Sequence, residues 1–213
     1  MSKQANYTKN LVLCALFVAL ITVGAYIKIP LGYMTLSSQF LFTNLAGVFL
    51  KKWWGSLACL MYVLLGLFGV PVFVSGGGFS YVLKPTFGYL IGFIVGAFVC
   101  GLMIEKLPCK FAWILLASLV NMAIVYICGM IYYYFIVTLY IGDNITLKTF
   151  FVSCFLVTLP GDILSCAVSA ILGKRLIPIL SPNVKNKTAS NEASNDINNE
   201  INSEASNEKG FDK

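Results

Sequence analysis

The sequence contains no histidine and few charged residues. Charged residues make up 11% of its 213 residues and hydrophobic residues 58%, whereas a soluble domain carries roughly 25% charged residues. A soluble core cannot bury that much apolar surface, so we expect an integral membrane protein. The missing histidine removes the commonest metal ligand and the commonest general base.

Residue sets for catalysis or nucleotide hydrolysis are also missing. The chain has no Ser-His-Asp set, no paired carboxylates and no Walker phosphate loop. Its seven cysteines include no C-x-x-C pair, and we interpret them as small apolar residues within helices. We therefore expect no enzyme activity, no cofactor and no metal. Energy for uphill transport would have to come from another chain or from an ion gradient.

The apolar stretches predict an all-α fold with six transmembrane helices, since one crossing needs about 20 residues. The helices are expected at 10–29, 36–50, 53–69, 85–104, from 111 to about 129, and 160–180. Pro30 cannot continue the first helix, and Gly129 is expected to loosen or end the fifth. The Tyr- and Phe-rich segment 130–159 would then be re-entrant or interfacial.

Pro160 leaves two positions open for Asp162. If Pro160 starts the last helix, Asp162 lies in its first turn, at the outer end. If Pro160 is a kink inside a longer helix, Asp162 lies near the midplane of the membrane. We predict the first arrangement, because the span 160–180 then has close to the expected length.

Lysine and arginine predict that both termini are cytoplasmic. With six spans, the inner segments hold Lys3, Lys9, Lys51, Lys52, Lys106, Lys110, Lys174, Arg175, Lys185 and Lys187. The outer segments hold only Lys28, Lys84 and Lys148, and positive residues favour the inner side. We expect a membrane domain over 1–182. The Asn-, Ser- and Glu-rich segment 183–213 cannot bury enough apolar surface to fold alone, so a disordered cytoplasmic tail is expected.

A few residues near the outer side are candidates for binding a small polar ligand. Lys84 and Asp162 either face an outward cavity, or they are a snorkelling lysine and a helix-capping carboxylate. Asn121 either contacts a ligand or bonds between helices. The other candidates are a glycine loop that is either mobile or closely packed (Gly76, Gly77 and Gly78) and two tyrosines that either line a pocket or pack between helices (Tyr81 and Tyr89). The last candidate is a pair of small residues on the first helix, Ala15 and Ala19.

Four segments occur in an order that resembles a known family. They read LVLCALFVALITVGAYIKIPLG, YVLLGLFGVPVF, SGGGFSYVLKPTFGYLIGF and LPGDIL, between about residue 9 and residue 180. The chain resembles the BioY family, the biotin-specific S components of energy-coupling-factor (ECF) transporters. The resemblance implies a six-helix subunit of the bacterial plasma membrane that opens its biotin site outward. It also implies docking on a transmembrane T component driven by two ATPases.

The resemblance assigns roles to the candidate residues. Ala15 and Ala19 would face the T component, the glycine loop and the start of the fourth helix would cover biotin, and Asp162 would be an acidic ligand-site residue. The family has a lysine three residues after this aspartate, where this chain has Ser165. We hypothesise that Lys84 supplies the missing positive charge.

Other functions remain open from the sequence. An S component for another vitamin, such as thiamine or riboflavin, would have the same general composition. An ion-coupled secondary transporter that works alone would need no partner ATPases. A membrane scaffold without a ligand is disfavoured by the glycine loop and the outer charges.

Overall fold

The computed structural model describes residues 3–31, 34–107, 110–138 and 158–180. The chain divides into two compact units, Met1–Lys174 and Arg175–Lys213, and the packing described below lies within the first. The predicted tail over 183–213 and most of the segment 130–159 lie outside the described residues.

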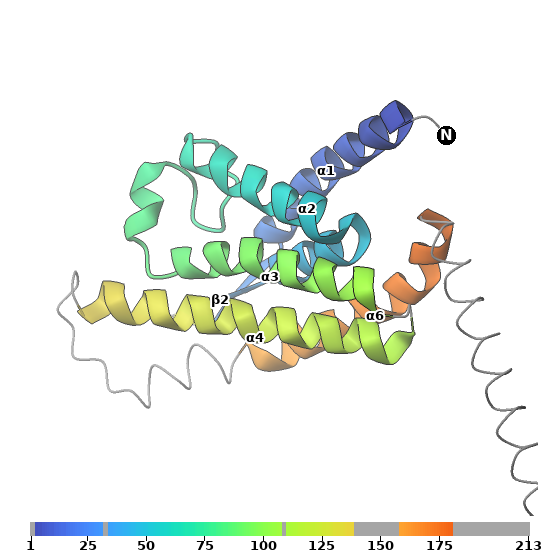
Figure 1. Ribbon diagram of the computed structural model, residues 1–213. Coiled ribbons are helices and arrows are strands. Elements are labelled where there is room, and N and C mark those ends of the chain that lie inside the picture. The colour runs from blue at the N-terminus through green and yellow to red at the C-terminus, as the bar shows by residue number, and fades with distance from the viewer. Residues whose placement is uncertain (1–2, 32–33, 108–109, 139–157, 181–213) are drawn as a thin grey trace, which may run out of the picture. The chain divides into compact units, whose positions relative to one another are not determined.

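The described part of the chain is mainly helical (Figure 1). Its elements are α1 (Lys3–Tyr26), β1 (Lys28–Leu31), β2 (Met34–Ser37), α2 (Gln39–Leu67), the 3-10 helix η1 (Phe79–Leu83), α3 (Phe87–Lys106), α4 (Phe111–Ile136) and α6 (Leu159–Leu180). Among the described helices, four are long and apolar enough to cross a membrane, namely Tyr7–Tyr26 within α1, and α2, α3 and α4.

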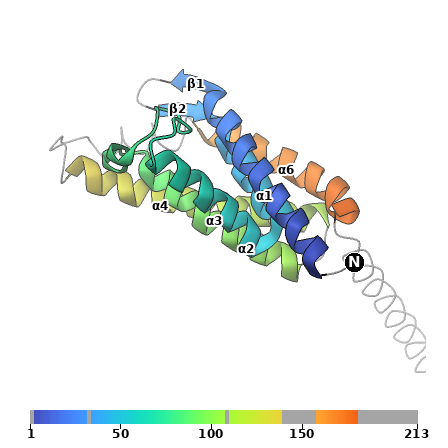
Figure 2. The same cartoon turned by 90° about the horizontal axis from the view of Figure 1, so that it is seen from above.

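A short antiparallel hairpin follows α1, and the sequence did not predict it. α1 ends at Tyr26, and β1 pairs with β2 from Lys28 opposite Ser37 to Leu31 opposite Met34. Residue 36, where the second helix was expected to begin, is therefore strand, and that boundary was wrong. Pro30 favours extended backbone over helix, which is consistent with a strand at this point. The hairpin and the loop 70–84 lie toward the end of the bundle away from the N-terminus (Figure 2).

α2 is broken where two apolar stretches were expected to meet. Lys51 has φ 67° and ψ −173°, which is not helical backbone. A Cβ placed on Gly55 would lie 2.8 Å from the Ala46 carbonyl oxygen, whereas a continuous helix would separate these residues by roughly 13 Å along its axis. The two arms of α2 therefore fold back on each other. The break agrees with the predicted separation of 36–50 from 53–69.

Glycines on α3 let α4 approach closely. A Cβ on Gly92 would lie 2.9 Å from Cα of Val125, and one on Gly88 would lie 2.3 Å from Cβ of Tyr132. Gly129 does not end α4, which continues to Ile136, so that prediction was wrong. Gly129 instead leaves room for the Tyr89 ring, which would lie 2.5 Å from a Cβ at that position.

α6 begins at Leu159, so Pro160 lies in its first turn and not at a kink within a longer helix. Proline is tolerated in the first turn because the amide hydrogen it lacks has no helical partner there. Asp162 also lies in this first turn, as predicted. This position directs the carboxylate into the cavity described next.

Candidate functional site

A cavity of about 130 Å³ lies among the hairpin, the loop 70–84 and the helices. One water needs roughly 10–15 Å³ by this measure, so the cavity has room for a small organic molecule. Its wall is formed by Ser37, Gln39, Phe40, Val74, Ser75, Tyr81, Thr86, Tyr89, Leu90, Phe93, Met122, Val125, Tyr126, Thr158 and Asp162. Nine of these fifteen side chains carry a hydroxyl, amide or carboxylate group, but most of the wall surface is apolar, as in most small-molecule sites.

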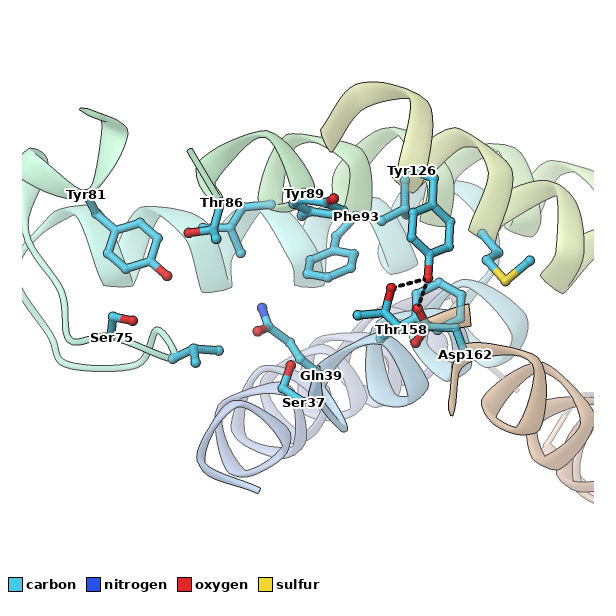
Figure 3. Close-up of a pocket in the computed structure, with 15 residues that line it drawn as sticks. Ser37, Gln39, Ser75, Tyr81, Thr86, Tyr89, Phe93, Tyr126, Thr158 and Asp162 are labelled. Atoms are coloured by element: carbon cyan, nitrogen blue, oxygen red, sulfur yellow. Dashed lines mark hydrogen bonds between the residues drawn. The ribbon is translucent and has the colours of Figure 1, made fainter. Parts of the chain in front are cut away.

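One end of the cavity carries a hydrogen-bonded set of three side chains (Figure 3). The Tyr126 hydroxyl donates to Oδ2 of Asp162 over 2.6 Å and lies 2.8 Å from Oγ1 of Thr158. Because the phenol has one proton, Thr158 donates to Tyr126 while Tyr126 donates to Asp162. An ionised carboxylate has about four acceptor positions, so Asp162 can accept from Tyr126 and from a ligand together.

The opposite end carries the hydroxyl groups of Ser75, Tyr81 and Thr86 (Figure 3). Burial raises the pKa of the Tyr81 phenol, and hydrogen bonds with Thr86 and Ser75 lower it in part. Tyr81 therefore stays neutral and can donate a hydrogen bond at physiological pH. This end of the cavity has hydrogen-bond donors, whereas the Asp162 end has a carboxylate acceptor.

The middle of the cavity is aromatic, with one amide. Phe40, Phe93 and Tyr89 contribute rings to the wall, and Gln39 points between the two polar ends (Figure 3). Gln39 is 3% exposed, and its Nε2 has no hydrogen-bond partner among the described residues. A buried amide donor of this kind costs stability unless it finds a partner, so a ligand carbonyl would be well placed here.

Three tyrosines fasten the loop 70–84 by donating to its backbone carbonyls. Tyr26 of α1 donates to the Pro71 carbonyl and Tyr132 of α4 donates to the Val82 carbonyl. Tyr62 of α2 donates to the Val72 carbonyl over 2.9 Å. The loop is also anchored by the buried ring of Phe73, which packs against Tyr62 and Tyr81. The loop is therefore closely packed against the helices, and it contributes Val74, Ser75 and Tyr81 to the cavity wall.

The predicted site residues separate into two groups. Tyr81, Tyr89 and Asp162 lie on the cavity wall. Gly76, Gly77 and Gly78 are not wall residues, and two of them have positive φ, 101° at Gly76 and 112° at Gly78. These glycines shape the loop that presents Ser75.

Asn121 is also not a wall residue. Its side-chain amide donates to Oδ1 of Asn44 over 2.9 Å, which favours the alternative that Asn121 forms an interhelical hydrogen bond.

The side chains of Lys84 and Ser165 form hydrogen bonds with groups other than Asp162. Lys84 is exposed, and its Nζ donates to the Ser75 carbonyl over 3.1 Å and lies 4.8 Å from the centre of the Tyr81 ring. Ser165 donates to the Gly161 carbonyl of its own helix over 2.9 Å. The geometry therefore places the charge of Lys84 behind the hydroxyl end of the cavity.

Ala15 and Ala19, the predicted docking pair, are exposed on α1. They are accompanied by the exposed apolar side chains of Leu11, Val12 and Leu16. A small-residue pair within an apolar helix face is typical of helix contacts in membranes.

Three polar wall residues were not predicted from the sequence, namely Gln39, Thr86 and Thr158. Thr86 follows Pro85 in the PTFGY segment, and Thr158 precedes the LPGD segment, so their neighbours gave some signal. The sequence signal for Gln39 was weaker, since it is only a polar residue among apolar neighbours. Its role becomes visible only when the hairpin brings the start of α2 under the loop.

Comparison with known proteins places the chain in a family. The model of the BioY family matches residues 1–182. A probable biotin transporter BioY from Lysinibacillus sphaericus is 38% identical over 181 residues, which cover 84% of this chain and 91% of that protein.

Solved structures have the same fold. The S-component for biotin from an ECF-type ABC transporter superposes with a TM-score of 0.71 at 25% identity, over 83% of this chain and 94% of that one. FolT bound with folic acid superposes with a TM-score of 0.60 at 18% identity, over 80% and 97% of the two chains. The second likeness concerns the fold alone.

Proposed function

Because the chain belongs to the BioY family, we propose that it is the biotin-binding S component of an ECF-type vitamin importer. It is a multi-pass membrane protein and a transport component, not an enzyme. The observation that carries the proposal is a largely apolar cavity with a carboxylate at one end and hydroxyl donors at the other.

The chemistry of biotin matches this arrangement. Its ureido ring has N–H donors, which suit the carboxylate of Asp162. Its carboxylate needs a donor, which the Tyr81 hydroxyl supplies at the other end, where this hydroxyl accepts from Ser75 and Thr86. The thiophane ring and valeryl chain between these polar groups would pack against Phe40 and Phe93. Hydrogen bonds would then bind both ends of the ligand, and apolar contacts would bind its middle.

The remaining features of an S component are part of the same proposal. The chain would cross the bacterial plasma membrane six times with both termini in the cytoplasm. It would dock through the α1 face around Ala15 and Ala19 on a T component with two ATPases. The exposed apolar side chains beside this pair support a contact with another membrane helix.

Titration of the detergent-purified chain tests the ligand. Saturable binding of biotin without any partner protein is expected, with thiamine and riboflavin as controls. The controls matter because the folate-bound FolT has the same fold, and a fold alone does not specify a ligand. Binding of thiamine or riboflavin in place of biotin would refute the proposed substrate while leaving the S-component function standing.

Uptake into vesicles tests the energy source. We expect no accumulation of labelled biotin with this chain alone, and ATP-dependent accumulation when the T component and both ATPases are present. Accumulation by the chain alone under a proton or sodium gradient would show an ion-coupled secondary transporter and refute the importer mechanism.

A further inference from the structure

A second group of polar side chains lies in the bundle interior, beyond the cavity. A Cβ on Gly173 of α6 would lie 3.0 Å from Val48 of α2 and 3.1 Å from Ile114 of α4, so these three residues form one layer. Residues four apart lie on the same helix face. One turn toward the cavity, the corresponding residues are Ser169, Asn44 and Ser118.

Asn121 joins this group, because it bonds to Asn44 and lies one turn from Ser118 on α4. We call Asn44, Ser118, Asn121 and Ser169 the polar layer. None is more than 1% exposed. None lines the cavity, so the layer is separate from the proposed biotin site.

Every member of the polar layer has a polar atom without a hydrogen-bond partner among the described residues. These atoms are Asn44 Nδ2, Asn121 Oδ1, Ser118 Oγ and Ser169 Oγ. The one strong bond within the layer runs from Asn121 Nδ2 to Asn44 Oδ1, which also accepts from Cys100 Sγ over 3.7 Å. Exchanging the nitrogen and oxygen of both amides still leaves one donor and one acceptor unused.

Four such atoms in one layer of a membrane protein point to a ligand. Buried polar groups are normally hydrogen-bonded to protein or to ordered water, and the surrounding lipid offers no bulk water. Buried waters usually make about three hydrogen bonds to otherwise unsatisfied groups. The polar layer offers two hydroxyls, one amide N–H and one amide oxygen.

We propose that the polar layer is a binding site for ordered water shared by α2, α4 and α6. Water both donates and accepts, and so it can satisfy the Asn44 N–H, the Asn121 oxygen and both serine hydroxyls. A monovalent cation fits less well, because it can use the oxygens but repels the N–H of Asn44, and the layer has no negative charge.

Serine-to-alanine variants in the full-length chain test this proposal by the sign of their effect. If Ser118 and Ser169 bind water, removing either hydroxyl breaks a hydrogen bond. Ser118→Ala and Ser169→Ala should then each lower Tm by about 2–4 °C in detergent. If the hydroxyls have no partner, removing one relieves a buried unsatisfied group, and Tm should stay the same or rise. That result would overturn the proposal.

A double-mutant cycle tests whether the site is shared. The effects of Ser118→Ala and Ser169→Ala should be less than additive, because either one disrupts the same water. Ser56→Ala is the matched control, since Ser56 donates directly to the Ile94 carbonyl over 3.1 Å. Its effect should add to that of Ser118→Ala. Additive losses for Ser118→Ala and Ser169→Ala would overturn a shared site.

Ion substitution separates water from a cation. Replacing sodium chloride with choline chloride at equal ionic strength should leave the Tm of the unaltered chain unchanged. A sodium- or potassium-dependent rise in Tm that Ser118→Ala abolishes would identify a cation site instead and overturn the water proposal.

Discussion

Tyr126 sets the direction of the hydrogen bonds at the Asp162 end of the cavity. Its single hydroxyl proton goes to the carboxylate, and the hydroxyl then accepts from Thr158. The three residues come from α4, from the residue before α6 and from the first turn of α6. The tyrosine therefore fixes the orientation of a carboxylate that belongs to another helix, and so prepares it for a ligand donor.

Removing this hydroxyl should weaken biotin binding without removing the carboxylate. We expect Tyr126→Phe to raise Kd about tenfold, because a hydrogen bond to a charged group contributes about 1.5 kcal/mol. Tyr134→Phe on the same helix is the control, since Tyr134 is exposed and should leave Kd unchanged. Titration with biotin measures both. Equal affinities for the unaltered chain and Tyr126→Phe would mean that Asp162 is positioned by other contacts.

Lys84 provides a second prediction at the scale of single residues. If its charge substitutes for the family lysine absent at Ser165, Lys84→Ala should weaken biotin binding, and adding Ser165→Lys should partly restore it. The contacts of Lys84 with the Ser75 carbonyl and the Tyr81 ring place its charge at the hydroxyl end, away from Asp162. Weaker binding by Lys84→Ala without rescue by Ser165→Lys would therefore mean that the charge acts at the hydroxyl end and does not replace the family lysine. Normal biotin affinity in Lys84→Ala would disprove the hypothesis, and titration of both variants decides the matter.

Among the elements, α2 has the most unusual backbone. Lys51 adopts φ 67° and ψ −173°, a region that is essentially restricted to glycine and costs a side-chain-bearing residue about 1–3 kcal/mol. The turn is confined by α3, since a Cβ on Gly101 would lie 2.3 Å from the Lys51 carbonyl carbon. The ion pair between Lys52 and Glu105, at 3.0 Å, holds the turn against the same helix.

Glycine at the break should stabilise the protein. We expect Lys51→Gly to raise Tm by about 2–4 °C, because the strain relieved exceeds the added flexibility of the unfolded chain by roughly 1 kcal/mol. Lys52→Gly is the control and should lower Tm, since it places glycine in regular helix and removes the ion pair with Glu105. Thermal unfolding in detergent measures both. A fall in Tm for Lys51→Gly would show that the lysine side chain stabilises the turn.

The elements also show how far the sequence alone could lead. Pro160 was informative because its effect on a helix is local, and it gave the start of α6. Gly129 misled because its role is to accept the Tyr89 ring from another helix, which no local pattern reveals. The strands Lys28–Leu31 and Met34–Ser37 are too short to show a period. Gln39 enters the cavity wall only through tertiary structure.

For the whole molecule, the cavity joins most of the described elements. Its wall draws on β2, α2, the loop 70–84, α3, α4 and α6. A ligand that contacts all of them binds the folded state and not the unfolded one, so it stabilises the fold as a whole. At a biotin concentration one hundred times Kd, this linkage contributes about 2.7 kcal/mol.

The chain truncated after Pro182 should keep this stabilisation. The polar residues 183–213 follow the part that the family model matches, and we expect no contribution from them to the cavity. The truncated and full-length chains should show the same rise in Tm with biotin, and their Kd values should agree within about twofold, or ~0.4 kcal/mol. A lost or much smaller rise would assign the tail a part in binding.

The attachment of the loop 70–84 has a consequence for engineering. The loop is held by hydrogen bonds from Tyr26, Tyr62 and Tyr132 to backbone carbonyl oxygens. Every amino acid has such an oxygen, so many loop side chains can be changed without loss of these hydrogen bonds. Phe79 is 79% exposed and lies next to Gly78, two residues from Tyr81. A fluorophore attached at position 79 would be two residues from Tyr81 of the cavity wall, and the protein could serve as the sensing part of a vitamin biosensor.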